Sequence, residues 1–250
     1  MSTNNDMVFG RRPVIEAIKA GKSLDKIFVQ RNLEGELADE LFSLVKENKL
    51  VFTKVPIEKL NRLTRKNHQG IVAFISPIDF SNIDHIIDQC YAEGRNPLVL
   101  VLDRITDVRN FGAIVRTAEC SGVDAILIPA RGAAQISGDA MKTSAGALNL
   151  VPICRTQNLI AQLKLIQQSG ISLVACTEKA TETLYNTPFT QPSAIIMGAE
   201  DTGISPDILD ICEYKAQIPM VGKIESLNVS TSTGIILYEA IRQRNYTANN

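Results

Sequence analysis

From Leu98 onward the chain carries five apolar segments that scarcely alternate with polar residues, and they constrain its fold more than any other feature. Runs of Val, Ile and Leu indicate strands buried on both faces, which is typical of a parallel sheet covered by helices. The predicted strands are residues 98–102, 125–128, 171–176, 194–197 and 216–218, and the predicted helices are 112–121, 138–147, 159–169, 206–212 and 231–244. The sequence therefore predicts an α/β domain with a parallel sheet over residues 98–250.

Residues 1–76 contain shorter elements and predict a second, smaller α/β domain. Helices are expected at 12–18, 36–49 and 56–63, and strands at 25–29, 50–52 and 70–75. Residues 77–97 begin and end near prolines and hold one short helical pattern at 83–91, which is typical of a linker. A chain of 250 residues is long enough for this two-domain arrangement.

The composition limits the compartment and the chemistry. No apolar run approaches the roughly 20 residues of a membrane span. The five cysteines are odd in number and form no C-x-x-C pair, which favours reduced thiols in the cytoplasm over disulfides or a zinc site. Because His68 and His85 are the only histidines, neither a serine–histidine triad nor a histidine-bound metal is expected.

Positive charge gathers in the first third of the chain. Residues 1–80 hold 13 Lys and Arg against 10 Asp and Glu, whereas residues 81–250 hold 13 against 17. The predicted RNA-binding residues around the end of helix 56–63 are Lys59, Arg62, Arg65, Lys66 and His68. Helical spacing would place Lys59, Arg62 and Lys66 on one side, as a stripe facing RNA phosphates. The alternative is an ordinary solvated helix face.

Three polar loops follow the predicted strands 98–102, 194–197 and 216–218, at the edge where open α/β sheets bind ligands. The first holds Asn110, a predicted helix N-cap, and Arg116, a lone cation in an apolar helix that either extends to solvent or lies buried beside the site. The second is a glycine-rich turn beginning at Gly198, where a ligand can approach the backbone closely. The third runs from Ser226 through Asn228 into a helix N-terminus. Turn formation and capping explain each loop singly, but three at one edge predict a site.

Two common nucleotide-binding motifs are missing from these loops. No G-x-G-x-x-G follows the first strand, so a dinucleotide site is not expected. Residues 198–205 have the glycine spacing of a P-loop, but Ile204 stands where the phosphate-binding lysine would be. The loops therefore do not predict binding of NAD or ATP.

Together the loops resemble the three motifs of the SpoU/TrmH family of SPOUT-class RNA 2′-O-ribose methyltransferases. The matching residues are Asn110-x-Gly112-Ala-Ile-x-Arg116-Thr-Ala, Gly198-Ala-Glu200-x-x-Gly203-Ile and Ile218-Pro-Met-x-Gly-x-x-Glu-Ser226-Leu227-Asn228-Val229-Ser230, in the family's order. Thr231, where the family usually has a small residue such as Ala, is a departure. Phe9-Gly10-Arg11 and His68-Gln69-Gly70-Ile71-Val72-Ala73 resemble the L30e-like substrate-binding domain of bacterial large-subunit rRNA guanosine methyltransferases in this family.

The resemblance implies features that the residue pattern alone does not show. The catalytic domain would end in a trefoil knot, and the protein would be a homodimer in which Arg116 serves the neighbouring subunit's cofactor. S-adenosylmethionine would bind against the knot through Thr177, Gly198, Ile218 and Leu227. The catalytic set would be Arg116 with Asn110, Glu200, Ser226 and Asn228, which orient Arg116, the RNA and the cofactor.

The activity so implied is methylation of a ribose 2′-OH in RNA, most directly at a guanosine of 23S rRNA. Methyl transfer from a sulfonium needs an aligned hydroxyl rather than a metal. Arg116 either takes the hydroxyl proton or stabilises the phosphate and the developing alkoxide, since an ordinary guanidinium titrates near pH 12.5 or above. Two alternatives are a tRNA-modifying relative and a catalytically silent RNA-binding ribosome-assembly factor. Loss of Arg116 or Asn228 would favour silence, and neither residue is lost.

Overall fold

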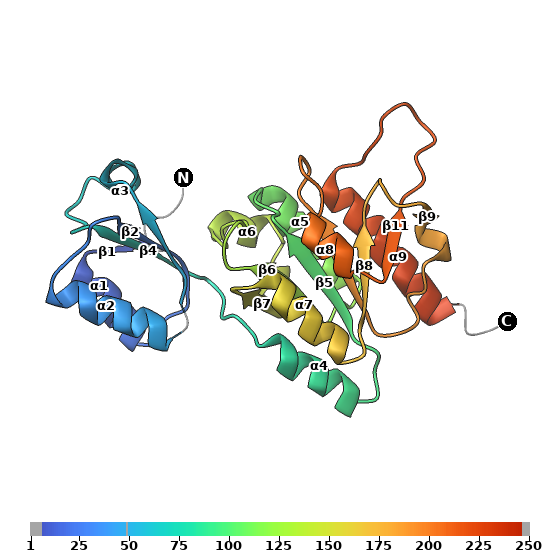
Figure 1. Cartoon of the computed structure of the whole chain (residues 1–250), viewed down its shortest axis with the longest axis horizontal. Helices are drawn as coiled ribbons and strands as arrows, with labels where there is room; N and C mark the ends of the chain where they lie inside the picture. The colour runs from blue at the N-terminus through green and yellow to red at the C-terminus, as the bar shows by residue number, and fades with distance from the viewer. Residues whose placement is uncertain (1–6, 49, 247–250) are drawn as a thin grey trace. The chain divides into compact units, whose positions relative to one another are not determined.

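The computed structural model describes residues 7–48 and 50–246, and the chain divides into two compact units (Figure 1). The first comprises Met1–Asp79 and Gln135–Asp139, and the second comprises Phe80–Ala134 and Ala140–Asn250. Helix α4 (Ile83–Ala92) lies inside the predicted linker 77–97, yet its apolar residues belong to the core of the second unit. No helix among the described residues is both long and apolar enough to cross a bilayer.

In its described part, the first unit is a four-stranded mixed sheet with the order β1-β4-β2-β3. Strands β2 and β3 are parallel, whereas β4 is antiparallel to β1 and β2. The elements are β1 (Met7–Phe9), α1 (Arg11–Lys19), β2 (Leu24–Gln30), α2 (Glu36–Glu47), β3 (Phe52–Val55), α3 (Ile57–Leu63) and β4 (Ile71–Ile75).

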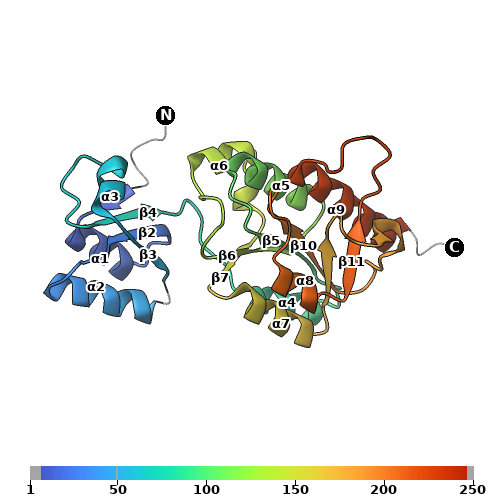
Figure 2. The ribbon, with the colours of Figure 1, turned by 45° about the horizontal axis from the view of Figure 1, so that its top comes forward.

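The two faces of this sheet are covered differently, because successive strand residues point to opposite sides. Ile27 and Val29 face α1 and α2 and belong to the larger apolar core. Phe28 and Phe74 face the other side, where they form an edge-to-face pair and pack with Leu60 of α3. Figure 2 shows α3 on one side of this sheet and the α1–α2 pair on the other.

Over residues 80–246, the second unit is a seven-stranded parallel sheet with the order β7-β6-β5-β10-β8-β11-β9. Its strands are β5 (Leu98–Asp103), β6 (Ala125–Pro129), β7 (Ile153–Thr156), β8 (Ser172–Cys176), β9 (Glu182–Thr183), β10 (Ser193–Gly198) and β11 (Tyr214–Gln217). Every residue of the interior strand β5 is buried, as its unalternated sequence predicts. The predicted α/β fold with a parallel sheet is confirmed.

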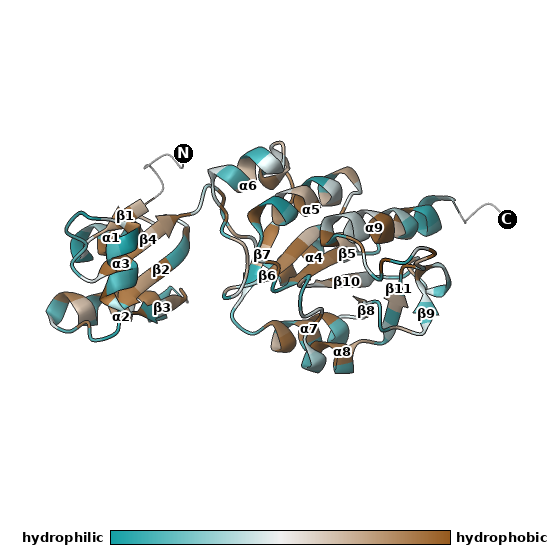
Figure 3. Ribbon diagram, turned by 90° about the horizontal axis from the view of Figure 1, so that it is seen from above, coloured by the Kyte–Doolittle hydropathy of each residue, from teal (hydrophilic) through white to brown (hydrophobic). Residues whose placement is uncertain are grey.

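Helices cover both faces of this sheet, and Figure 3 shows α5 and α9 on one side with α7 and α8 on the other. The apolar residues of α4, α7 and α8 form one core with Val99, Val101 and Leu127 of the sheet. The helices not yet bounded are α5 (Val108–Cys120), α6 (Gly138–Thr143), α7 (Leu159–Gln168), α8 (Pro206–Ile211) and α9 (Val229–Tyr246), with short 3-10 turns η1 (Ala147–Asn149) and η2 (Leu184–Asn186).

The sequence pattern does not predict β1, β7 or β9. Strand β7 follows a proline and contains Arg155 and Thr156, so its apolar part is too short to stand out. Strand β9 has two residues. Helix α9 begins at Val229, two residues before the predicted start, and this shift matters for the site because it places Asn228 directly before the first turn.

Candidate active site

Hydrogen bonds join side chains from three separate segments at the carboxyl edge of the second sheet. Asn110 lies in α5 after β5, Glu200 lies in the loop after β10, and Asn228 directly precedes α9. Asn110 Nδ2 donates to Glu200 Oε1 at 3.1 Å, and Asn228 Nδ2 donates to the same oxygen at 2.6 Å and to Asn110 Oδ1 at 3.1 Å. These three residues, which we call the polar network, bring together one residue from each predicted motif.

Asn228 performs two tasks with the two ends of its amide. Its Oδ1 accepts hydrogen bonds from Ser230 N–H at 3.0 Å and from Ser230 Oγ at 2.6 Å, so it caps α9. Its Nδ2 donates to the polar network. Capping, which the sequence offers as the ordinary explanation for Asn228, therefore does occur but uses only the oxygen. An aspartate could supply the cap but not the donors.

Glu200 also contacts the beginning of α9. Its Oε1 accepts a hydrogen bond from Val229 N–H at 3.4 Å, in addition to the two asparagine donors. Unpaired N–H groups and the positive end of the helix dipole both favour a carboxylate at this position. The polar network is thus fixed to a helix N-terminus as well as to β5 and β10.

Asn110 is not the helix N-cap that the sequence predicts. Helix α5 begins at Val108 rather than Gly112, and Asp107 caps it by accepting a hydrogen bond from Asn110 N–H at 2.8 Å. The Asn110 side chain, lying in the first turn, is therefore free of capping and both ends of its amide bond Glu200 and Asn228. The correction changes the local role of Asn110 and accounts for its place in the network.

Gly198 closes the second loop on itself. A Cβ on Gly198 would lie 2.2 Å from the carbonyl carbon of Gly203 and 2.3 Å from Ile204 N, distances that real contacts do not reach. Across the loop, Gly203 N–H donates to the Ala199 carbonyl at 2.8 Å. The backbone that comes close to Gly198 is therefore that of Gly203 and Ile204 in the same loop. Glu200 lies in this closed loop.

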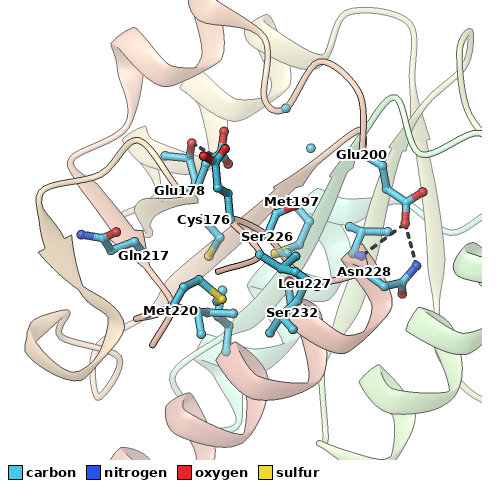
Figure 4. A pocket seen from close by; sticks show the side chains of 18 of the residues that line it. Cys176, Glu178, Met197, Glu200, Gln217, Met220, Ser226, Leu227, Asn228 and Ser232 are labelled. Atoms are coloured by element: carbon cyan, nitrogen blue, oxygen red, sulfur yellow. Dashed lines mark hydrogen bonds between the residues drawn. The ribbon is translucent and has the colours of Figure 1, made fainter. Parts of the chain in front are cut away.

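A cavity of about 700 Å³ lies beside the polar network. All four predicted cofactor-binding residues line it, namely Thr177, Gly198, Ile218 and Leu227. Three of the predicted catalytic residues also line it, namely Glu200, Ser226 and Asn228. In Figure 4, Glu200 and Asn228 face each other at one end of the cavity, and Cys176 and Glu178 lie toward the other end. The cavity is thus built from the carboxyl ends of β8, β10 and β11 and the loop that leads into α9.

Sequence reasoning missed several apolar and polar residues of the lining. Cys176 is the last residue of β8, and Met197 is the penultimate residue of β10. Glu178 follows β8, and Met220 follows β11. The rule that ligands bind at the carboxyl ends of parallel strands would have found them, because it applies to each strand end and not only to polar loops.

The charged groups of the lining favour a cationic ligand. Among the described lining residues these groups are three carboxylates and one ammonium, from Glu178, Glu200, Glu225 and Lys223. Burial raises the pKa of the Cys176 thiol, so it stays protonated at neutral pH. Within residues 7–48 and 50–246, no three His, Cys, Asp or Glu side chains are grouped to hold a metal ion.

Of the two positions that the sequence leaves open for Arg116, the structure shows the exposed one. Its side chain is exposed on α5 and does not line the cavity. It follows Asn110 by six residues, about one and two-thirds helical turns, so the two side chains leave α5 on different faces. The structure therefore brings four of the five predicted catalytic residues to the network and cavity, and Arg116 does not line that cavity within this chain.

The four basic residues Lys59, Arg62, Arg65 and Lys66, which we call the basic segment, are all exposed. Helix α3 ends at Leu63 because Thr64 adopts an extended conformation, so the predicted helical stripe does not continue to Lys66. Two of the ammonium groups instead lie over aromatic rings of the sheet. Lys59 Nζ is 4.8 Å from the Phe28 ring centroid, and Lys66 Nζ is 5.6 Å from that of Phe9.

His68 has a structural role within the first unit. It is only 7% exposed, and both ring nitrogens are used within the fold. Nδ1 accepts a hydrogen bond from Gly70 N–H at 3.1 Å, so Nε2 carries the proton that bonds Asn61 Oδ1 at 2.9 Å. His68 thus ties the turn before β4 to α3, and its predicted role in RNA binding stays a prediction.

Comparisons with known proteins agree with this geometry. The sequence profile of the SpoU rRNA methylase family matches residues 97–238, and a profile for RNA 2′-O ribose methyltransferase substrate binding matches residues 7–81. The chain belongs to the SpoU methyltransferase family. The predicted resemblance is therefore confirmed over both parts of the chain.

Relatives within the SpoU family match along nearly their whole length. The 23S rRNA (guanosine-2′-O-)-methyltransferase RlmB of Photobacterium profundum is 35% identical over 247 residues, which cover 96% of this chain and 99% of that protein. A protein of Staphylococcus saprophyticus assigned to the TrmH family of tRNA/rRNA methyltransferases is 34% identical over 241 residues, with 96% of each chain covered.

Solved structures show the same SpoU fold. The SpoU methyltransferase AviRb of Streptomyces viridochromogenes, in complex with AdoMet, aligns with a TM-score of 0.60 and 26% identity, covering 95% of this chain and 90% of AviRb. The TrmH/SpoU tRNA modifying enzyme of A. aeolicus aligns with a TM-score of 0.55 and 32% identity, covering 64% of this chain and 84% of that enzyme.

Proposed function

We propose that this SpoU protein uses S-adenosylmethionine to methylate a ribose 2′-OH in RNA, and that its principal substrate is a guanosine of 23S rRNA. The observation that carries the proposal is the polar network, which joins Asn110, Glu200 and Asn228 beside a cavity of about 700 Å³. A ligand-sized cavity next to ordered polar groups at the carboxyl edge of a parallel sheet is the expected form of such a site.

The cavity suits S-adenosylmethionine in size and in charge. Its volume falls within the roughly 300–1,000 Å³ of small-molecule sites. Met197, Ile218 and Leu227 offer apolar surface for a purine, and the excess of carboxylates over ammonium groups complements a sulfonium. The residues that would hold the cofactor are Thr177, Gly198, Ile218 and Leu227. When bound, it would supply an electrophilic methyl group.

The residues of the chain would position the nucleophile rather than form covalent intermediates. Glu200, with its donors Asn110 and Asn228, would hold the loop edge on which the ribose rests, and Ser226 would contribute a hydroxyl at the cavity wall. Aligning the reacting atoms in this manner can supply much of the acceleration of a methyl transfer. Arg116 would act as the base or as the electrostatic anchor for the RNA phosphate and developing alkoxide.

The protein would work as a cytoplasmic homodimer with a trefoil knot at the C-terminal end of the catalytic domain. Arg116 is exposed and outside the cavity of its own chain, which supports a role at the cavity of a second copy. In functional terms, residues 1–76 would capture RNA and 98–250 would catalyse, and the segment 77–97 would link them only in its first residues, because α4 packs in the core of the second unit. RNA capture would rest on the exposed basic segment, which offers four cations to phosphates.

Two alternatives to this function are methylation of tRNA and a catalytically silent role in ribosome assembly. A tRNA target has support from the relative in Staphylococcus saprophyticus, whose name covers both tRNA and rRNA. The RlmB relative, which matches over 99% of its own length, supports 23S rRNA instead. A catalytically silent assembly factor would not need the polar network, and here the network is complete.

Ribose-methylation mapping of rRNA and tRNA from cells with and without this protein would test the proposal. One guanosine of 23S rRNA should lose its 2′-O-methyl group in the deletion strain and regain it when the purified protein and S-adenosylmethionine are added to the extracted RNA. Loss of a tRNA site would move the substrate to tRNA. An unchanged map in both RNA classes would contradict methylation altogether.

A further inference from the structure

Asp103 is a buried carboxylate at the carboxyl end of β5, outside the polar network and outside the lining of the cavity. Its exposure is 3%, and one oxygen, Oδ2, accepts two hydrogen bonds from a single residue 102 positions later. Ser205 N–H donates at 2.7 Å and Ser205 Oγ donates at 2.6 Å. Hydrogen bonds to an ionised carboxylate are among the stronger ones in proteins, and short lengths such as these are typical of them.

Arg104 adds a second attachment between the same two segments. Its guanidinium lies 3.2 Å from Asp103 Oδ1, and its Nη2 donates to the Gly203 carbonyl at 3.0 Å. Arg104 makes both contacts from a backbone φ of +60°, which a residue other than glycine rarely takes. The end of β5 therefore holds the returning arm of the loop at two points of contact, Gly203 and Ser205.

These contacts act on the loop that carries Glu200. The outgoing arm leaves β10 at Gly198, which β5 also holds through the pairing of Gly198 with Asp103. The returning arm passes close enough to Gly198 to exclude a Cβ there. Both arms of the loop are therefore fixed to one residue of β5, and Glu200 is the loop residue that reaches the polar network.

We propose that Asp103 is a positioning residue: through Ser205 it holds the 198–205 loop closed, and the closed loop sets the place of Glu200 and of the cavity wall formed by Gly198, Ala199 and Gly203. This inference rests on the proposed function, since it assigns Asp103 a part in cofactor binding and methyl transfer. Asp103 would touch neither the cofactor nor the RNA.

A matched control stands at the opposite end of the same strand. Asp124 Oδ2 accepts a hydrogen bond from Leu98 N–H at 2.8 Å, and its Oδ1 pairs with Arg95 at 2.6 Å. Asp124 thus combines a backbone N–H and an arginine as Asp103 does, but at the amino edge of the sheet, away from the site. Its loss should affect stability without affecting the loop.

The first test measures the loop without any cofactor. Hydrogen exchange of full-length wild type, Ser205→Ala, Ser205→Thr, Asp103→Asn and Asp124→Asn would be followed at the amides of residues 199–205. Ser205→Ala and Asp103→Asn should exchange there about tenfold faster, the effect of losing one charge-assisted hydrogen bond, and Ser205→Thr should restore protection. Equal protection in wild type and Ser205→Ala, or faster exchange of this loop in Asp124→Asn, would overturn the proposal.

The second test measures binding and catalysis in the same proteins. Ser205→Ala and Asp103→Asn should weaken S-adenosylmethionine binding about tenfold by calorimetry and should also lower kcat at saturating cofactor and RNA, because Glu200 is displaced. Asp124→Asn should leave both within about twofold. An unchanged kcat in Ser205→Ala would reduce Asp103 to a purely structural role and refute its positioning role. If wild type itself bound no S-adenosylmethionine, the proposed function would fail, while the exchange data would still decide whether Asp103 holds the loop.

Discussion

The polar network of the second unit and the basic segment of the first unit use polar side chains in opposite ways. In the network, Glu200 and Asn228 are bonded at 2.6 Å and both are bonded to Asn110. In the basic segment, the cations are exposed, and none of the four forms an ion pair with a described residue.

This difference indicates two kinds of work. Side chains already held by one another lose little freedom when a ligand binds, so the network suits precise placement of reacting groups. Exposed cations that no carboxylate neutralises attract phosphates over about a Debye length and do so less in salt. Catalysis is therefore expected in the second unit and electrostatic capture of RNA in the first. Variants of the second unit should change methyl transfer, and variants of the basic segment should change RNA binding.

The largest effect is expected for Arg116→Ala. Arg116 is an exposed cation of the second unit and does not belong to the polar network. Removing a group that stabilises developing charge should lower kcat by about 100-fold or more. Dimerisation and S-adenosylmethionine binding should stay close to wild type, since Arg116 does not line the cavity. Single-turnover methyl transfer and calorimetry would measure these quantities. Retention of more than about a tenth of kcat, worth about 1.4 kcal/mol, would limit Arg116 to positioning.

Mixing two impaired variants would show which cavity Arg116 serves. If it serves the partner's cavity, a dimer of one Arg116→Ala subunit and one Asn228→Asp subunit retains one complete site. Random mixing should then restore about a quarter of wild-type activity. No recovery on mixing would place Arg116 at the cavity of its own chain or would mean that the protein does not dimerise.

Asn228→Asp should give the next largest effect, because it separates the two tasks of this residue. The aspartate keeps an oxygen for Ser230 and so keeps the cap on α9, but it cannot donate to Glu200. We expect a loss of activity of about tenfold to 100-fold with weaker cofactor binding, and some loss of thermal stability at neutral pH because the new carboxylate would lie against that of Glu200. Asn228→Ala, which removes cap and donor together, should lose stability as well. Normal activity in Asn228→Asp would show that the network is not needed for catalysis.

The site could largely be predicted from the sequence because parallel strands fix where the loops after them begin. Once 98–102 and 194–197 are recognised as buried strands, their carboxyl ends are expected at one edge with Asn110 and Glu200. That these two residues meet there depends on β5 pairing with β10, which the sequence does not reveal. The local role of Asn110 could not be predicted, because it depends on where α5 begins, and Asp107 rather than Asn110 caps that helix. The sequence left the direction of Arg116 open, because a long cationic side chain in an apolar helix can reach solvent or a cleft.

The first unit was harder to predict for a different reason. A helical stripe requires the helix to continue, and Thr64 ends α3 after only seven residues. His68, which next to four cations resembles an RNA ligand, is instead turned inward by a hydrogen bond from Gly70 two residues away. Short elements leave such choices to local hydrogen bonds that no periodicity reveals. The knot depends on the path of the whole chain and stays a prediction.

A smaller effect, on RNA binding alone, is expected when Arg62, Arg65 and Lys66 are all replaced by glutamine. Each lost phosphate contact should flatten the dependence of log affinity on log salt by about 0.7 to 0.9, so the triple variant should lose about 2 to 3 from the slope. The affinity for S-adenosylmethionine should not change. The matched control replaces three other exposed cations of the same unit, Arg12, Lys22 and Lys46, and should flatten the slope less. Equal slopes for both triple variants would favour an ordinary solvated face.

The smallest effect should come from a paired charge away from both sites, Glu239 of α9. It is 7% exposed and accepts hydrogen bonds from Arg242 Nε and Nη2, each at 2.8 Å, and these bonds hold the pKa of its carboxyl below the ordinary value. A lowered pKa in the folded state means that ionised Glu239 stabilises the fold above the ordinary carboxyl pKa, and that this stabilisation disappears as the pH falls through the lowered value. Glu239→Gln should therefore cost about 1 kcal/mol at pH 7, and the two unfolding curves should converge in acid.

An exposed ion pair in the first unit serves as the control for the buried carboxylate of Glu239. Glu40 pairs with Lys19 at 2.6 Å, but the two side chains are 40% and 55% exposed. Solvent and salt screen such a pair, so Glu40→Gln should cost less than about 0.5 kcal/mol and should be sensitive to salt. Denaturant unfolding between pH 3 and pH 7 would measure both variants. A larger cost for Glu40→Gln than for Glu239→Gln, or a Glu239→Gln deficit that persists unchanged at pH 3, would mean that burial of the carboxylate is not what gives the α9 pair its strength.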